Sequence, residues 1–141
     1  MNATSLMMIA VAGVALCGCN KAESPADVRH DVAEATAEGN RDVAEARADA
    51  QKDSIDAQTD VAEAVANHQV ADAINQSHEA DRVAVKGDAK VQLAQAEAAH
   101  KVEIQKCEAL AGDARKQCKD GADANLDAAK QHAEARLDAT R

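Results

Sequence analysis

Polar and apolar residues repeat with a period of eleven over the first half of this chain. The string DVAEA begins at Asp31 and again at Asp42, a degenerate DSIDA begins at Asp53, and DVAEA returns at Asp60. Eleven residues make three helical turns, so one stripe of a helix keeps facing the same side. That stripe carries four valines with alanines between them, namely Val32, Val43, Val61 and Val65. The pattern predicts a nearly straight helix that self-associates weakly.

The start of this helix is marked more clearly than its end. Ser24 can accept at the N-cap and Pro25 is tolerated at the first helical position, so the helix is expected to begin at Pro25. Gly39-Asn40 and Gly87-Asp88 are candidate breaks, because a glycine in a helix interior costs about 1 kcal/mol. Neither must end the helix. A helix continuous to about Leu110 would reach roughly 130 Å, either as a coiled coil or with part of its length disordered.

The second half of the chain has a different pattern. Its apolar residues come in pairs two apart, Val83/Val85, Val91/Leu93 and Val102/Ile104. The eleven-residue step then returns in the strings ANLDA and ARLDA, which begin at Ala124 and Ala135. These segments are also expected to be helical.

Two cysteines with ten residues between them predict a turn near the C-terminal end. On one continuous helix Cys107 and Cys118 would lie ~16 Å apart, beyond the reach of a disulfide bond. Gly112 suits the left-handed conformation that closes a helix, and Asp113 is a good N-cap for the next one. An antiparallel αα-hairpin would bring the cysteines together. The alternative is a continuous helix in a parallel dimer, with each cysteine bonded to its mate.

The segment from Cys107 to Cys118 resembles a cysteine hairpin of uncharacterised, alanine-rich envelope proteins of proteobacteria, with the pattern C-x-A-L-x-G-x-A-x-x-x-C. The resemblance implies the hairpin but no activity. Zinc ligation is not expected, because the chain has no CxxC pair. Redox chemistry is disfavoured as well, since Cys107 lies at the C-terminal end of a helix.

Composition decides how much this chain can bury. It has no Phe, Tyr or Trp, and alanine supplies most of its apolar residues. A compact globular core is therefore not expected, and the fold class is all-α, a long extended Ala-rich helix that ends in a disulfide-closed αα-hairpin. The net charge of −9 argues against nucleic acid as a partner. Most of that negative charge lies between Lys21 and Asp81, a segment with fifteen acidic and five basic residues.

The first twenty residues have no charged side chain. The apolar run from Leu6 to Leu16 is too short to span a bilayer and has the length of a signal-peptide core. The sequence Leu16-Cys17-Gly18-Cys19 resembles the lipobox of bacterial lipoproteins, in which the final cysteine becomes the acylated N-terminus. That resemblance implies lipidation at Cys19, carrying acyl chains such as palmitate. Asn20 in the next position implies sorting to the outer membrane rather than the inner one.

Catalytic and metal-binding constellations are not expected. The five histidines show no HExxH or other paired spacing. A Ser/His/Asp set would need a rigid scaffold that this composition does not favour. Acidic runs such as Asp53, Asp56, Asp60 and Glu63 are typical of a hydrated helix face. We therefore predict no enzyme activity, no cofactor and no metal site.

These observations predict four regions. They are a signal peptide (1–18), a lipidated tether (19–24), an acidic Ala-rich repeat helix (25–99) and a C-terminal hairpin (100–141). The predicted function is that of a spacer or adaptor anchored in the periplasmic leaflet of the outer membrane, with a weak homo-oligomer or an envelope protein as partner. Inner-membrane anchoring and a soluble periplasmic form are the alternatives in location. A stress-protective or chaperone-like polypeptide, similar to late-embryogenesis-abundant proteins, is the alternative in function.

Overall fold

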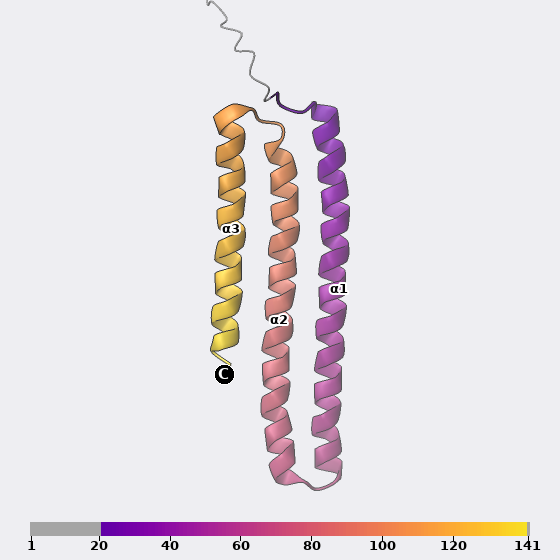
Figure 1. The fold of residues 1–141 in the computed structure, drawn as a ribbon. Helices are drawn as coiled ribbons and strands as arrows, with labels where there is room; N and C mark the ends of the chain where they lie inside the picture. The colour runs from indigo at the N-terminus through magenta and orange to yellow at the C-terminus, as the bar shows by residue number, and fades with distance from the viewer. Residues whose placement is uncertain (1–20, 141) are drawn as a thin grey trace, which may run out of the picture.

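Three antiparallel helices lie side by side in one flat layer (Figure 1). The computed structural model describes residues 21–140, so the signal segment and the predicted lipidation site Cys19 lie outside the described residues. The helices are α1 (Pro25–Ala66), α2 (Val70–Cys107) and α3 (Gly112–Asp138). The central helix α2 contacts both neighbours, whereas α1 and α3 do not contact each other. The predicted all-helical class is confirmed for the described part of the chain.

The predicted start of α1 is confirmed. Ser24 is the N-cap, its hydroxyl accepts from the backbone N–H of Asp27, and Pro25 opens the first turn. Pro25 lacks a backbone N–H, which would have no partner inside the helix at this position.

The expectation of one continuous helix is wrong, because the chain reverses at residues 67–69. Asn67 caps α1 and His68 adopts a left-handed conformation with φ of 59°. The His68 N–H donates to the Val65 carbonyl and the Gln69 N–H donates to that of Ala64. These two hydrogen bonds form a Schellman motif, which normally has glycine at the left-handed position. The predicted repeat helix at 25–99 is thus divided into α1 and most of α2.

The two glycine sites that were predicted as candidate helix breaks lie inside helices. A Cβ atom at Gly39 would be 2.6 Å from the Cβ atom of Ala98, and one at Gly87 would be 2.9 Å from that of Ala50. Both glycines therefore allow α1 and α2 to approach closely. The two contacts are related by the sequence repeat, since eleven residues separate Gly39 from Ala50 and also Gly87 from Ala98.

The eleven-residue repeat of α1 is the seam that packs on α2. Apart from Asp31, the residues of α1 that are not fully exposed recur at intervals of four, four and three residues, at positions 28, 32, 35, 39, 43, 46, 50, 54, 57, 61 and 64. Val32, Val43 and Val61 lie on this seam as predicted. Val65 does not, since it follows the seam residue Ala64 and remains 59% exposed.

The apolar pairs of α2 are explained by its central place in the layer. Residues two apart lie on nearly opposite sides of a helix. Val83 and Val91 border hollows shared with α1. Val85 and Leu93 fall on the side of Ala96, which lines a hollow shared with α3. The pairs Val83/Val85 and Val91/Leu93 thus each give one residue to each neighbouring helix.

The core that results is narrow and built from small residues. The buried apolar residues are Ala35, Ala64, Ala89, Cys107, Ala122 and Ala133. Small side chains let the helix axes come close but bury little apolar area at each contact. This agrees with the absence of aromatic residues from the sequence.

Candidate functional site

The α2–α3 connection is closed by the Cys107–Cys118 disulfide bond, with the two Cα atoms 5.6 Å apart. The bond lies within one chain, as the hairpin interpretation predicted, and Cys107 is fully buried. The helical hairpin that this bond closes consists of all of α2, from Val70, and α3.

The two predicted turn residues differ in outcome. Gly112 has a φ of 56°, so the expected left-handed conformation is confirmed. Asp113 is not the N-cap, because that position is occupied by Ala111, which makes no side-chain cap. Asp113 lies instead in the first turn of α3, where a carboxylate is favoured by the exposed N–H groups of the helix.

A group of charged residues joins this connection to α3. The Glu108 carboxylate accepts from Arg115 at 3.1 Å and also from Lys119. The hydrogen bond from Lys119 lowers the pKa of Glu108, and the positive charges of Lys119 and Arg115 add to the effect against the opposing influence of desolvation. The carboxyl group is therefore held in its charged form.

The same connection holds the N-terminal tether. The Glu23 N–H donates to the Glu108 carbonyl at 2.9 Å. Arg115 donates to the Lys21 carbonyl at 2.6 Å and to the Leu110 carbonyl at 2.8 Å. We call these residues, Lys21, Glu23, Glu108, Leu110 and Arg115, the base clamp. It fixes the chain only two residues after Cys19. Its residues are far apart along the chain, so no local sequence pattern could predict it.

The opposite end of the molecule, here called the tip, is the α1–α2 turn with the helix ends that flank it. A groove of about 530 Å³ opens there. Its apolar lining is Val61, Val65, Val70, Ala73 and Ile74. Helix α3 ends at Asp138, near Arg82 and Lys86, so it does not reach the tip. Figure 1 shows the α1–α2 pair projecting beyond the C-terminal end of α3.

Large apolar side chains are exposed mainly near this groove. Five are more than a third exposed within the described residues, namely Ile55, Val65, Val70, Ile74 and Leu110. Val65, Val70 and Ile74 line the tip groove, whereas Ile55 and Leu110 do not. Val65 was predicted to lie on the valine stripe of the repeat, and no sequence pattern pointed to Val70 or Ile74.

Carboxylates form a second feature of α1, which runs its whole length. All eleven Asp and Glu residues of this helix directly precede a seam residue. They are Asp27, Asp31, Glu34, Glu38, Asp42, Glu45, Asp49, Asp53, Asp56, Asp60 and Glu63, and we call them the carboxylate stripe. The carboxylate stripe recurs every eleven residues, as the seam does. The carboxylates therefore all lie within about a third of the helix circumference.

Lysines of α2 meet part of this stripe. Lys101 donates to Glu38 and to Asp42, each at 2.8 Å, and these bonds raise the pKa of Lys101. Lys90 lies 3.7 Å from Asp53, which repeats the Lys101–Asp42 pairing one eleven-residue step further along both helices. These ion pairs are exposed and add little stability individually. They favour the observed register because they recur with the seam.

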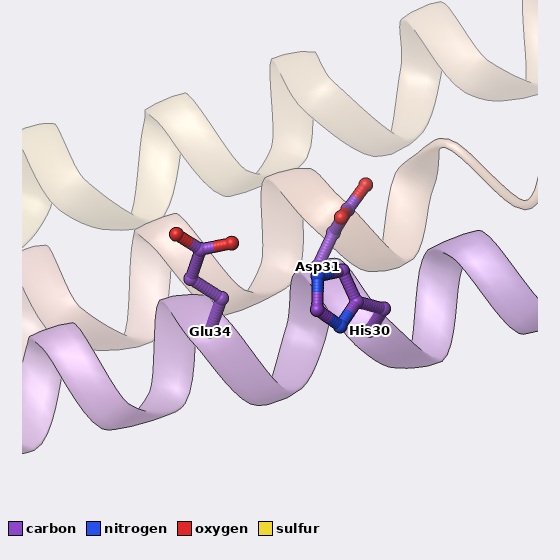
Figure 2. Close-up of side chains that lie close together, drawn as sticks. All are labelled: His30, Asp31 and Glu34. Carbon is purple, nitrogen blue, oxygen red and sulfur yellow. The ribbon is translucent and has the colours of Figure 1, made fainter.

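One small group of metal-binding side-chain types occurs on α1 (Figure 2). His30, Asp31 and Glu34 each offer a ligand atom within 4.8 Å of the others. All three come from one helix, with His30 and Glu34 exposed and Asp31 half-buried, and the cluster includes no donor from another element. Three side chains of this kind are usually hydrated, so the group does not change the expectation that the chain has no metal site. The sequence showed no paired spacing for any histidine, so it gave no sign of this group.

No helix within residues 21–140 is both long enough and apolar enough to cross a membrane. Comparisons with protein families, with curated proteins and with solved structures found no match.

Proposed function

We propose that this protein is a lipid-anchored envelope lipoprotein that acts as a non-catalytic spacer or adaptor. In this proposal Cys19 is acylated and holds the chain in a membrane, with the periplasmic leaflet of the outer membrane as its location. The three-helix layer stands on the anchor and carries its tip away from the membrane surface.

The base clamp is the observation that carries this proposal. Its hydrogen bonds hold Lys21 and Glu23 against the disulfide-closed connection, so the tether leaves the molecule at that end. A lipid on Cys19 would therefore place the disulfide end at the membrane and the tip at the far end. In this arrangement the tip is the end that can meet an envelope partner.

The folded-back chain also has a shorter reach than a continuous helix. Helix α1 has 42 residues, and at about 1.5 Å per residue it extends about 60 Å. That is about half of the roughly 130 Å expected for an unbroken helix. The carboxylate stripe keeps this length hydrated, and several acyl chains together make release from a membrane negligible.

Fluorescence energy transfer to acceptor lipids tests the orientation. A donor dye is attached through Asn67→Cys at the tip or through Asp113→Cys near the base, with the lipidated chain in vesicles. The proposal expects strong transfer from position 113 and weak transfer from position 67. Equal transfer from both positions would mean that the layer lies flat on the membrane, and the spacer proposal would then be wrong.

Mass spectrometry of the N-terminal peptide tests the anchor itself. The expected peptide begins at Cys19 and carries the mass of the acyl groups. Cys19→Ser is the control, since it should leave an unlipidated chain that no longer fractionates with membranes. A native chain that is unmodified and free in the periplasmic extract would overturn the proposal.

Circular dichroism separates the spacer from the stress-protectant alternative. A spacer needs its helices in dilute buffer, where the chain should show strong helicity and a cooperative thermal transition. A protectant of the late-embryogenesis-abundant kind would be unfolded in dilute buffer and become helical only on drying or in trifluoroethanol.

A further inference from the structure

The α1–α2 pair has two chemically different faces. A helix turns about 100° per residue, so Asp60 of the carboxylate stripe lies about 100° from Val61 in one direction, whereas Val65 lies about 40° away in the other. The groove lined by Val65, Val70 and Ile74 shares no residue with the hollow lined by Asp53, Asp56, Asp60 and Glu79. The tip groove and the carboxylates therefore open on opposite faces of the layer.

The face that holds the groove, here called the neutral face, continues along α1 away from the tip. None of the α1 residues on this side is acidic, and most are alanine or uncharged polar residues, namely Ala33, Ala37, Asn40, Ala44, Ala48, Gln51, Ile55, Gln58, Ala62 and Val65. Its charged side chains include Arg47 from α1 and Asp88 from α2, which border one hollow further along the same face. Small neutral side chains allow another helix to approach closely.

From these features we propose that the neutral face is a dimer interface and that its occupant is a second copy of this chain. A two-fold axis parallel to the helices would place α1 of each copy against α2 of the other. The two α1–α2 pairs then form a four-helix bundle in which all neighbouring helices are antiparallel. Both carboxylate stripes remain outside and hydrated.

The register of the α1–α2 pair makes this arrangement self-complementary. Ala50 lies opposite Gly87, so Arg47 is at nearly the same height as Asp88, about one helical turn or less apart along the axis. Across the two-fold axis, Arg47 therefore meets Asp88 of the second copy. By the same register Ala62 meets Ile74 and Val65 meets Val70, so the exposed apolar residues of one tip cover those of the other.

A second copy fits this face better than a lipid surface does. Residues 53–81 contain seven carboxylates and no lysine or arginine, whereas amphipathic helices that bind membranes carry basic residues on their polar side. The two-fold arrangement also leaves both N-terminal ends on the same side, so it is compatible with two anchors in one membrane. It does not depend on the anchor and can be tested apart from the proposed function.

Sedimentation equilibrium of the full chain in a non-ionic detergent tests the interface over a wide range of concentrations. The expected result is a monomer–dimer equilibrium. Ile74→Asp should weaken the association constant about tenfold or more, because burial of an isoleucine side chain contributes about 1.5–3 kcal/mol. Asn75→Asp is the matched control, an exposed neighbour that adds the same charge on a different side of α2, and it should change the constant less than about twofold.

A charge exchange tests the two-fold pairing directly. Arg47→Glu should weaken the dimer, and adding Asp88→Arg should restore it, because each new pair then has opposite charges again. Asp88 also lies 3.6 Å from Arg136 of its own chain, so both variants are made in an Arg136→Gln background that removes this ion pair. Circular dichroism melts of every variant control for folding. A chain that stays monomeric at all concentrations would overturn the proposal. So would equal weakening by Ile74→Asp and Asn75→Asp, or a failure of the charge exchange to restore association.

Discussion

At the scale of single residues, close contact between α1 and α2 depends on two glycines. A helix interior normally favours alanine over glycine, yet Gly39 and Gly87 lie where an added Cβ atom would meet the Cβ atom of an alanine at less than 3 Å. The contacts involve atoms close to the backbone, so neither side chain can rotate away. Only a shift of a whole helix would make room.

We predict that Gly39→Ala destabilises the fold although it raises helix propensity. Overpacking costs about 1–3 kcal/mol and the propensity gain is about 1 kcal/mol, so the net loss should be as much as about 2 kcal/mol. Urea denaturation measures this change. Gly121→Ala in α3 is the control, because a Cβ atom there meets nothing within 4 Å and the substitution should stabilise the chain. A stabilising Gly39→Ala would contradict the close approach.

A second prediction at this scale concerns the base clamp and pH. The pKa of Glu108 is lowered by its hydrogen bond from Lys119, so the folded state favours the charged carboxylate more than the unfolded state does. The contribution of Glu108 to the stability of the fold is complete above its ordinary pKa of about 4.5. It is lost as the pH falls through the lower pKa that Glu108 has in the folded state.

The measurement is urea denaturation of the native chain and of Glu108→Gln across that acidic range. The native chain should lose more stability on acidification than the variant does. Parallel curves for the two proteins would show that Glu108 contributes nothing to the pH dependence.

At the scale of helices, the eleven-residue repeat determines how α1 and α2 align. The α1 seam, the Gly39–Ala98 and Ala50–Gly87 contacts, and the pairing of Lys101 and Lys90 with α1 recur at this interval. An insertion of eleven residues in each helix should therefore reproduce every contact. An insertion of nine residues makes two and a half turns and should rotate the seams apart.

Duplicating residues 43–53 in α1 together with residues 84–94 in α2 should lengthen the layer by about 16 Å and leave it at least as stable. The duplicated segment of α2 also repeats the side that packs on α3. Small-angle X-ray scattering measures the length and thermal denaturation the stability. Nine-residue duplications of 45–53 and 84–92 are the control and should leave the tip sensitive to proteolysis. If the eleven-residue and nine-residue variants were equally stable, the repeat would not set the register.

The sequence predicted the helical segments and their repeat better than it predicted how they pair. Three features could be predicted because each depends on residues close in sequence. They are the helix start at Ser24 and Pro25, the hairpin at Cys107 and Cys118, and most of the apolar stripe of α1. The reversal at 67–69 was missed because His68 occupies a position where glycine is usual. Gly39 and Gly87 were misread for a related reason, since a glycine required by a neighbouring helix looks the same in a sequence as one that ends a helix.

At the scale of the whole molecule, charge and shape are closely connected. The net charge is −9, and eleven carboxylates follow one side of α1 while only a few lysines of α2 face them. A flat layer one helix thick cannot bury these charges, so they repel each other across water. Dissolved salt screens such repulsion over distances of about 10 Å at 0.1 M.

We therefore predict that salt stabilises the fold. The melting temperature of Cys19→Ser, which removes the proposed lipid site without changing the described helices, should rise by a few degrees between low ionic strength and about 0.15 M salt. Screening of the exposed ion pairs acts in the opposite direction but is the smaller effect, because carboxylates outnumber their partners. A melting temperature that falls with salt would mean that the lysine pairs dominate.

The carboxylate stripe also matters during synthesis of the chain, before α2 has been made. During synthesis α1 emerges first, with an unpaired seam whose repeats could match those of α1 in another nascent chain. Each seam residue follows an acidic residue. Pairing of two α1 helices through their seams would therefore bring two carboxylate stripes close together, and their negative charges would repel. The lysine-bearing segment made next adds positive charge opposite the stripe, so α1 pairs more favourably with α2 of its own chain than with α1 of another.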